Sequence, residues 1–249
     1  MRTYRQQCRQ YQGDLIMKIT VSPAAWLIAF CLVPLAAFAN GGGSMPSSSP
    51  EPMRQMTPAE IARSAYNDGV RLVKKAQKYE ETAASATKDD KKAKALGQAG
   101  KQYEKARQYF AGAISKQAEM YEAWNYIGYT SRKLGEYDKA LAAYDEALRL
   151  KPDYSDAIEY RGEAYLGLNR VEDAKQAYMS LFGAARPLAD QLMAAMQRWV
   201  AVRRTDAAGV SGTDLDTFAQ WISERTTIAQ QTASLAVDGP AASQAANWK

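Results

Sequence analysis

Residues 121–154 of this 249-residue chain read YEAWNYIGYTSRKLGEYDKALAAYDEALRLKPDY, and residues 155–188 repeat the pattern as SDAIEYRGEAYLGLNRVEDAKQAYMSLFGAARPL. An offset of 34 aligns identical residues at seven positions: Ala123 and Ala157, Tyr126 and Tyr160, Gly128 and Gly162, Leu134 and Leu168, Ala140 and Ala174, Ala143 and Ala177, and Tyr144 and Tyr178. Identity at this many positions with a single offset indicates an internal repeat. A period of this length is typical of stacked supersecondary units.

Each repeat has the pattern of two helices packed against each other. Apolar residues of the first repeat recur at helical spacing in two stretches, Trp124, Ile127 and Leu134, then Leu141, Tyr144, Ala147 and Leu148. Small residues are required where two helix axes approach, and Gly128 and Ala140 occupy such places. Gly162 and Ala174 are their counterparts in the second repeat. Pro152 ends the second helix, because proline disfavours the helical conformation of the residue before it. The pattern predicts an all-α chain of helical hairpins.

The sequence resembles the tetratricopeptide repeat family, whose unit is a 34-residue helical hairpin. The resemblance rests on the period and on Trp124, Gly128, Ala140, Tyr144 and Pro152 at their offsets. It implies a helical-hairpin solenoid that binds a peptide or partner protein, and the chain resembles the exported bacterial members of the family. No enzymatic activity, no cofactor and no metal are expected.

In that family the first helices of successive units line a concave groove that holds the partner. The implied partner contacts are Glu122, Asn125, Tyr129, Arg132 and Lys133 in one repeat and Asp156, Glu159, Glu163, Leu166 and Gly167 in the next. One wall is then partly basic and the other acidic, which suits a peptide that carries both charge signs. Tyr129 is an aromatic residue that the hairpin core does not require. The alternative is that these charges only solvate a helix surface.

A degenerate repeat with a lengthened hairpin is expected over residues 57–120. The stretch KQYEKARQYFAGAISK, residues 101–116, precedes the second helix of the first full repeat by one period and resembles it. Its partner is a helix from Pro58 to about Thr82, capped by Thr57 and Glu60. Gly69 precedes Ala106 by 37 residues, whereas Gly128 precedes Ala140 by 12. The difference predicts an insert of 25 residues that extends both helices, with a turn near residues 88–90.

Downstream of the repeats, residues 189–236 keep a helical pattern without the period of the repeats. Leu188, Leu192, Met196 and Val200 mark one apolar face, and a second helix should open at Ser211 or Thr213. These helices are expected to cap the stack, because the last repeat of an array leaves an apolar face to be covered. The tail, residues 237–249, has the composition of a disordered segment.

Residues 1–39 have the pattern of a leader. From Met17 the chain reads MKITVSPAAWLIAFCLVPLAAFA, with a basic residue, an apolar run and the small residues of a cleavage site before Asn40. Translation is expected to start at Met17. The alternative is that residues 1–16 are translated and form an extended leader. Residues 40–56 are rich in Gly, Ser and Pro and predict a flexible linker. The expected location is the periplasm. The alternatives are secretion or attachment to the membrane by an uncleaved signal.

Removal of that leader changes the charge balance. The whole chain has 32 basic and 27 acidic residues, a net charge of +5. The leader holds Arg2, Arg5, Arg9 and Lys18 against Asp14, so the remainder carries 28 basic and 26 acidic residues, or +2. Nucleic acid is therefore not the expected partner.

The residue inventory also argues against most enzymatic chemistry. The chain has no histidine, and both cysteines, Cys8 and Cys31, lie in the leader. The commonest general base, metal ligand and thiol nucleophile are therefore missing. Glu159 and Glu163, at positions i and i+4, leave open a carboxylate-dependent cell-wall hydrolase as an unlikely alternative. A structural or self-associating envelope scaffold is the other alternative to partner binding.

Overall fold

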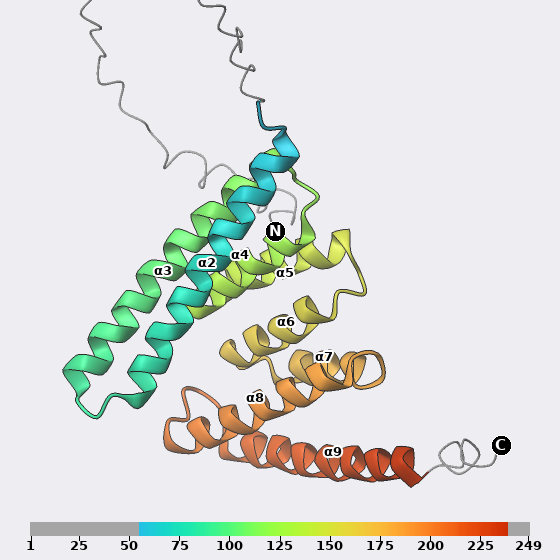
Figure 1. Ribbon diagram of the computed structural model, residues 1–249. Helices are drawn as coiled ribbons and strands as arrows, with labels where there is room; N and C mark the ends of the chain where they lie inside the picture. The colour runs from blue at the N-terminus through green and yellow to red at the C-terminus, as the bar shows by residue number, and fades with distance from the viewer. Residues whose placement is uncertain (1–54, 239–249) are drawn as a thin grey trace, which may run out of the picture. The chain divides into compact units, whose positions relative to one another are not determined.

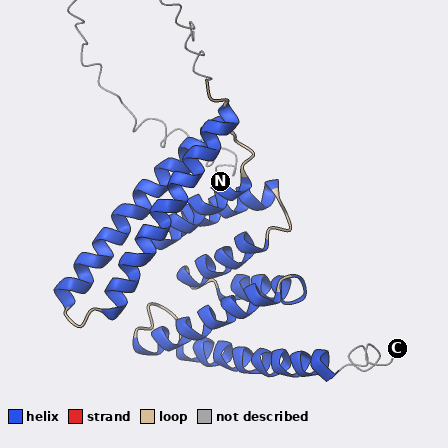
Figure 2. Ribbon diagram, in the orientation of Figure 1, coloured by secondary structure: helices blue, strands red, loops and turns tan. Residues whose placement is uncertain are grey.

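The computed structural model describes residues 55–238, with side chains as far as Thr232, and these residues form eight α-helices and no strand (Figure 2). The helices are α2 (Pro58–Ser85), α3 (Asp89–Lys116), α4 (Tyr121–Lys133), α5 (Tyr137–Leu150), α6 (Ser155–Gly167), α7 (Val171–Ala184), α8 (Arg186–Thr205) and α9 (Gly212–Asp238). The predicted all-α fold is confirmed. The predicted leader, nearly all of the linker and the tail after Asp238 lie outside the described residues.

Consecutive helices pair into hairpins that stack along the chain (Figure 1). The pairs are α2 with α3, α4 with α5, α6 with α7, and α8 with α9. The first helices of three successive hairpins also contact one another, α4 with α6 and α6 with α8. These helices therefore form an inner layer. No helix within residues 55–238 combines the length and the apolar character that crossing a lipid bilayer requires.

In each of the first two hairpins, a close contact between a glycine and an aromatic ring holds the two helices together. A Cβ atom on Gly128 would lie 2.5 Å from the ring of Tyr144, which is fully buried. In the first hairpin, a Cβ on Gly69 would lie 2.6 Å from the ring of Phe110, which precedes Tyr144 by one period of the repeat. The same contact recurs although the two helices of the first hairpin are longer. This equivalence confirms the lengthened hairpin.

Helices α2 and α3 have 28 residues each, against 13 in α4. At about 1.5 Å per residue, they are about 42 Å long and α4 about 20 Å. The turn between them spans residues 86–88, slightly earlier than predicted, because Asp89 and Asp90 already form the first turn of α3. Acidic residues at that position are favoured by the partial positive charge of a helix N-terminus.

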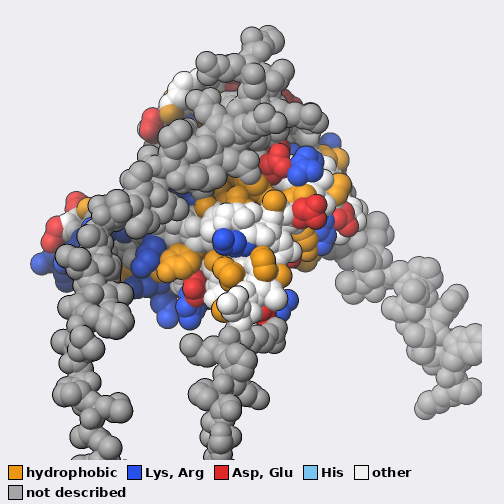
Figure 3. Space-filling model, turned by 90° about the horizontal axis from the view of Figure 1, so that it is seen from above, with side chains coloured by type: hydrophobic (Ala, Val, Ile, Leu, Met, Phe, Trp, Pro, Cys, Tyr) orange, Lys and Arg blue, Asp and Glu red, His pale blue; other side chains and the backbone are white. Residues whose placement is uncertain are grey.

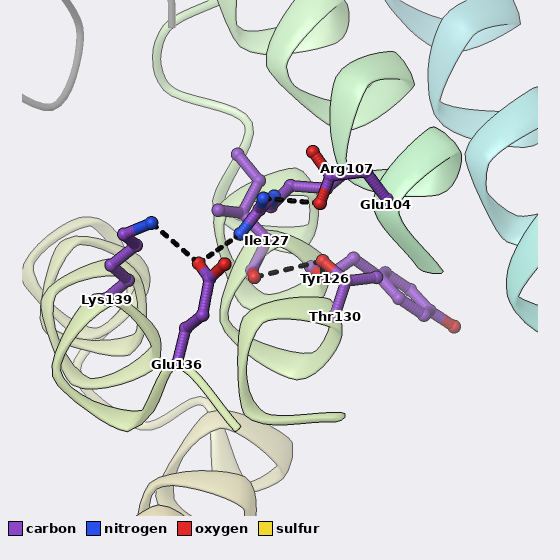
Figure 4. A network of polar contacts seen from close by, with 7 residues as sticks. All are labelled: Glu104, Arg107, Tyr126, Ile127, Thr130, Glu136 and Lys139. Carbon is purple, nitrogen blue, oxygen red and sulfur yellow. Dashed lines mark hydrogen bonds and ion pairs between the residues drawn. The ribbon is translucent and has the colours of Figure 1, made fainter. Parts of the chain in front are cut away.

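A buried arginine links the lengthened hairpin to the next one (Figure 4). Arg107 of α3 donates to Glu104 and to Glu136, each at 2.5 Å, and Lys139 of α5 lies 2.8 Å from Glu136. Burial alone would raise the pKa of Glu136, but the bonds from Lys139 and Arg107 hold that pKa below its usual value. The network joins α3 to the start of α5, where Glu136 precedes the first turn.

The spacing of the helices changes where the repeats end. Helix α6 begins at Ser155, one full period after the start of α4 at Tyr121, whereas α8 begins at Arg186, before a further period is complete. The close neighbours of Gly162 are accordingly Leu192 of α8 and Ala177. Trp199 of α8 donates its Nε1 hydrogen to the carbonyl of Leu166 at 2.7 Å. Helix α8 therefore packs directly against α6 in the inner layer.

Helix α9 covers α8, as expected of a capping helix. Leu215, Phe218 and Ile222 of α9 are buried in one cluster with Trp199 and Met196 of α8. Its N-terminus is capped by Ser211, whose hydroxyl accepts a hydrogen bond from the backbone N–H of Asp214 at 3.1 Å. The helix continues to Asp238, slightly past the predicted start of the disordered tail.

Candidate inner-face site

The inner layer contains a hollow of about 850 Å³. Its lining comes mainly from α4, α6 and α8, with one residue each from α2 and α5: Glu80, Tyr129, Arg132, Lys133, Tyr137, Glu159, Tyr160, Glu163, Leu166, Gly167, Gln191, Ala194, Ala195, Arg198, Trp199, Val202 and Arg203. A concave site of this volume falls in the range that holds a peptide segment or a small ligand. The hollow exists because the first helices of successive hairpins lie side by side.

The structure places the predicted groove residues in two groups. One group lines the hollow and consists of Tyr129, Arg132, Lys133, Glu159, Glu163, Leu166 and Gly167. The other group, Glu122, Asn125 and Asp156, lies toward the N-terminal ends of α4 and α6 and does not line it. Asn125 is only 2 % exposed. The hollow thus lies away from the N-terminal first turns of α4 and α6.

Opposite charges in the hollow are paired across the helices. Arg132 of α4 forms an ion pair with Glu163 of α6, and Lys133 Nζ lies 2.8 Å from Glu80 of α2. Arg198 of α8 lies 3.9 Å from the second carboxylate oxygen of Glu163. The expected basic residues of α4 and acidic residues of α6 are present, but Arg132 and Glu163 pair with each other and Lys133 pairs with Glu80 of α2. A charged partner must therefore displace one member of these ion pairs, or it must bind to other residues of the hollow.

Tyr129 is a packing residue rather than a free aromatic side chain. It is 7 % exposed, and its hydroxyl accepts a hydrogen bond from Gln77 Nε2 of α2 at 3.1 Å. Its ring lies 6.0 Å from the ring of Tyr103 and 5.1 Å from that of Tyr160, between centroids. The expectation that the core does not require Tyr129 was wrong, because the lengthened α2 covers a position that a hairpin of ordinary length leaves open.

The guanidinium of Arg132 lies between two tyrosine rings. Its Cζ atom is 5.4 Å from the ring centroid of Tyr129 and 5.5 Å from that of Tyr160. Contacts of this kind favour the charged guanidinium through the negative faces of the rings. Together with the ion pair to Glu163, they hold Arg132 in place at the base of the hollow.

Glu159 is a carboxylic acid buried beneath the hollow. The residue is 2 % exposed, and its Oε2 atom has no hydrogen-bond partner among the described residues. Burial, followed by the nearby charge of Glu163, raises its pKa to about 8, although Arg132 acts in the opposite direction. At neutral pH Glu159 is therefore mostly protonated and uncharged. Its Oε2 atom is also out of contact with solvent.

Helix α8 supplies the lining residues that the sequence did not reveal. Two of them are well exposed, with 68 % of the Arg198 side chain and 55 % of Val202 accessible. The residues of α8 that face the hollow follow helical spacing: Gln191, Ala194, Ala195, Arg198, Trp199, Val202 and Arg203. A comparison at the offset of the repeat misses them because α8 begins before a full period has passed since the start of α6. Glu80 was missed because the insert displaces α2 in the sequence.

Comparison with protein families identifies the repeat itself. The family model of the tetratricopeptide repeat matches residues 121–154, the hairpin formed by α4 and α5. The chain is therefore a protein that contains a tetratricopeptide repeat. Repeats of this family generally mediate protein–protein interactions, and the family is typically a non-enzymatic interaction module.

Proposed function

We propose that the chain binds a segment of a partner protein, or a free peptide, in the hollow between α4, α6 and α8. The observation that carries the proposal is the hollow of about 850 Å³, built from the inner helices of the repeats and from α8. The matched repeat belongs to a family of protein-binding modules, which supports a polypeptide as the ligand.

The chemistry of the lining fits a polypeptide partner. Arginine is among the residues that most often dominate the energetics of protein interfaces, and the α8 wall carries Arg198 and Arg203 beside the buried Trp199. Arg203 stacks over Trp199 at 5.4 Å and donates to the Asn169 side chain at 3.1 Å, so this part of the wall is preorganised. Arg198 and the exposed Val202 remain available for contact with a partner.

Exposed residues of α8 provide the sharpest test, because their substitution leaves the core intact. In affinity capture from a cell extract, the variant Arg198→Glu with Val202→Asp should recover at least about tenfold less partner than the wild type, as expected when contacts worth about 2 kcal/mol are lost. The matched control is Arg149→Glu on α5, which reverses an equally exposed charge away from the hollow. Equal recovery with all three proteins would contradict binding in the hollow. A mass that rises with concentration, without a partner, would favour the self-associating scaffold.

We also propose that the protein acts in the periplasm. Support comes from the sequence between Met17 and Ala39, which has the order of basic, apolar and small residues that export signals share. Protein isolated from a periplasmic extract of a Gram-negative host should begin at Asn40 when its N-terminus is determined by mass spectrometry. Recovery of the protein only in the cytoplasmic fraction, with the leader intact, would contradict this location.

A further inference from the structure

The lengthened hairpin holds an unusual concentration of lysine. Between residues 74 and 105 the chain has nine of its sixteen lysines and no arginine. All nine are exposed, and none takes part in an ion pair among the described residues: Lys74, Lys75, Lys78, Lys88, Lys91, Lys92, Lys94, Lys101 and Lys105. Two of the five acids in the interval are already paired, Glu80 with Lys133 and Glu104 with Arg107. The hairpin is therefore strongly positive, although the chain without its leader is nearly neutral.

Four of these lysines form a line along α3. Lys91, Lys94, Lys101 and Lys105 are separated by three, seven and four residues, and such intervals place side chains on one face of a helix. At about 1.5 Å per residue the line is about 21 Å long. No Asp or Glu occurs from residue 91 to residue 103. We call these four residues the α3 lysine stripe.

The part of the hairpin that carries much of this charge projects beyond the next helix pair. A Cβ atom on Gly100 would lie 4.0 Å from the side chain of Leu134, the residue that follows α4, so the turn and the first residues of α3 extend past that level. Figure 1 shows the turn between α2 and α3 lying beyond α4 and α5. In Figure 3, Lys and Arg side chains gather on the same side of the described surface. The tip is therefore free to approach an extended surface.

We propose that the α2–α3 hairpin docks on an anionic lipid bilayer through the α3 lysine stripe. A bilayer presents a flat array of phosphates that can move laterally to meet a straight row of charges, and each lysine near an anionic membrane contributes favourably to binding. Lysine is a flexible point charge and needs no fixed geometry, unlike the planar guanidinium of arginine.

The same residues are less suited to nucleic acid. Recognition of single strands relies on aromatic side chains that stack on bases, but Tyr103 is buried and Tyr79 is half-buried in this interval. The specific contacts to duplex DNA are made most often by arginine, which is absent from residues 74–105. Residues 74–105 thus combine dense charge with no arginine and no exposed aromatic side chain. This inference does not depend on the function proposed for the hollow.

Vesicle binding tests the proposal on the full chain. Sedimentation is compared between vesicles of phosphatidylcholine alone and vesicles of equal parts phosphatidylcholine and phosphatidylglycerol. The measured quantity is the ratio of the two affinities, so any contact common to both vesicles cancels. The wild type should prefer the anionic vesicles, and the preference should fall as salt is added. The variant K91Q/K94Q/K101Q/K105Q should lose at least about tenfold of that preference.

A variant of equal charge change separates the stripe from net charge. K139Q/R149Q/R170Q/R204Q removes four exposed cations away from the stripe and should keep the wild-type preference. Circular dichroism confirms that both variants remain helical. An equal loss in the control variant, or no preference in the wild type, would overturn the proposal. Binding to duplex DNA that requires the four lysines, with vesicle binding unaffected by them, would also overturn it in favour of a nucleic acid.

Discussion

At pH 8, the variant Glu159→Gln is expected to be more stable than the wild type, and at pH 5 the difference should be much smaller. Burial raises the pKa of the Glu159 carboxyl from 4.5 to about 8 in the folded protein. Between these pH values the folded state holds a proton that the unfolded state lacks. Raising the pH through this window therefore favours unfolding, by up to about 1.4 kcal/mol per pH unit. Glutamine has a similar shape and no charge, so its stability should not follow this slope.

Denaturant unfolding at several pH values between 5 and 9 measures this effect. The control is Glu172→Gln on α7, where 78 % of the glutamate side chain is exposed and only a surface pair with Lys175 is lost. The control curve should run parallel to that of the wild type. If the curve of Glu159→Gln were also parallel to the wild type, Glu159 would be ionised in the folded protein at neutral pH, and its assignment as a buried neutral acid would fail.

Phe110→Ala is expected to lower the free energy of unfolding by about 3–5 kcal/mol, the usual cost of removing a large buried aromatic side chain. Phe110 is fully buried, its ring stacks on Tyr126 with 4.9 Å between centroids, and it contacts Tyr66 edge-on at 5.7 Å. It therefore joins α3 to both α2 and α4. Thermal or denaturant unfolding measures the loss.

A second substitution shows that the ring packs on the backbone of Gly69. Gly69→Ala in the wild type would place a Cβ atom 2.6 Å from the ring, and the overpacking should destabilise by about 1–3 kcal/mol. In the Phe110→Ala background the ring is gone, so the same change should become stabilising, because alanine favours helix over glycine by about 1 kcal/mol. Gly112→Ala, whose Cβ would meet nothing within 4 Å beyond its chain neighbours and the backbone of its own helix, should stabilise both backgrounds. Independent, additive effects of Gly69→Ala and Phe110→Ala would contradict this contact.

The repeat could be recognised from the sequence because the residues that make its contacts recur every 34 positions. Gly128 and Tyr144 meet within the first full repeat, and the aromatic position could be extended back by one period to Phe110. Helix α8 could not be placed in the same way. It joins the inner layer through contacts such as the hydrogen bond from Trp199 to the carbonyl of Leu166. Such contacts do not recur at the period of the repeat, so the sequence pattern does not reveal them.

The groove was only partly predictable for a different reason. Offsets within the repeat correctly located Arg132, Glu163 and Leu166 on the inner face. They could not show that Arg132 and Glu163 would pair with each other, because that depends on the distance between α4 and α6. Nor could they show that Tyr129 would be covered, because that depends on how far α2 extends beside α4.

The sequence by itself determined the helical hairpins, their stacking order and the extra length of the first one, because these depend on local periodicity and on small residues at repeated offsets. Only the tertiary structure decided which charges remain available to a partner. Glu163 and Lys133 are engaged in ion pairs with other helices, and burial keeps Glu159 protonated. Helix α8 packs beside α6 and contributes the exposed Arg198 to the hollow. Ionisation and accessibility depend on distances between helices and on exclusion of water, and these arise only when the hairpins pack together.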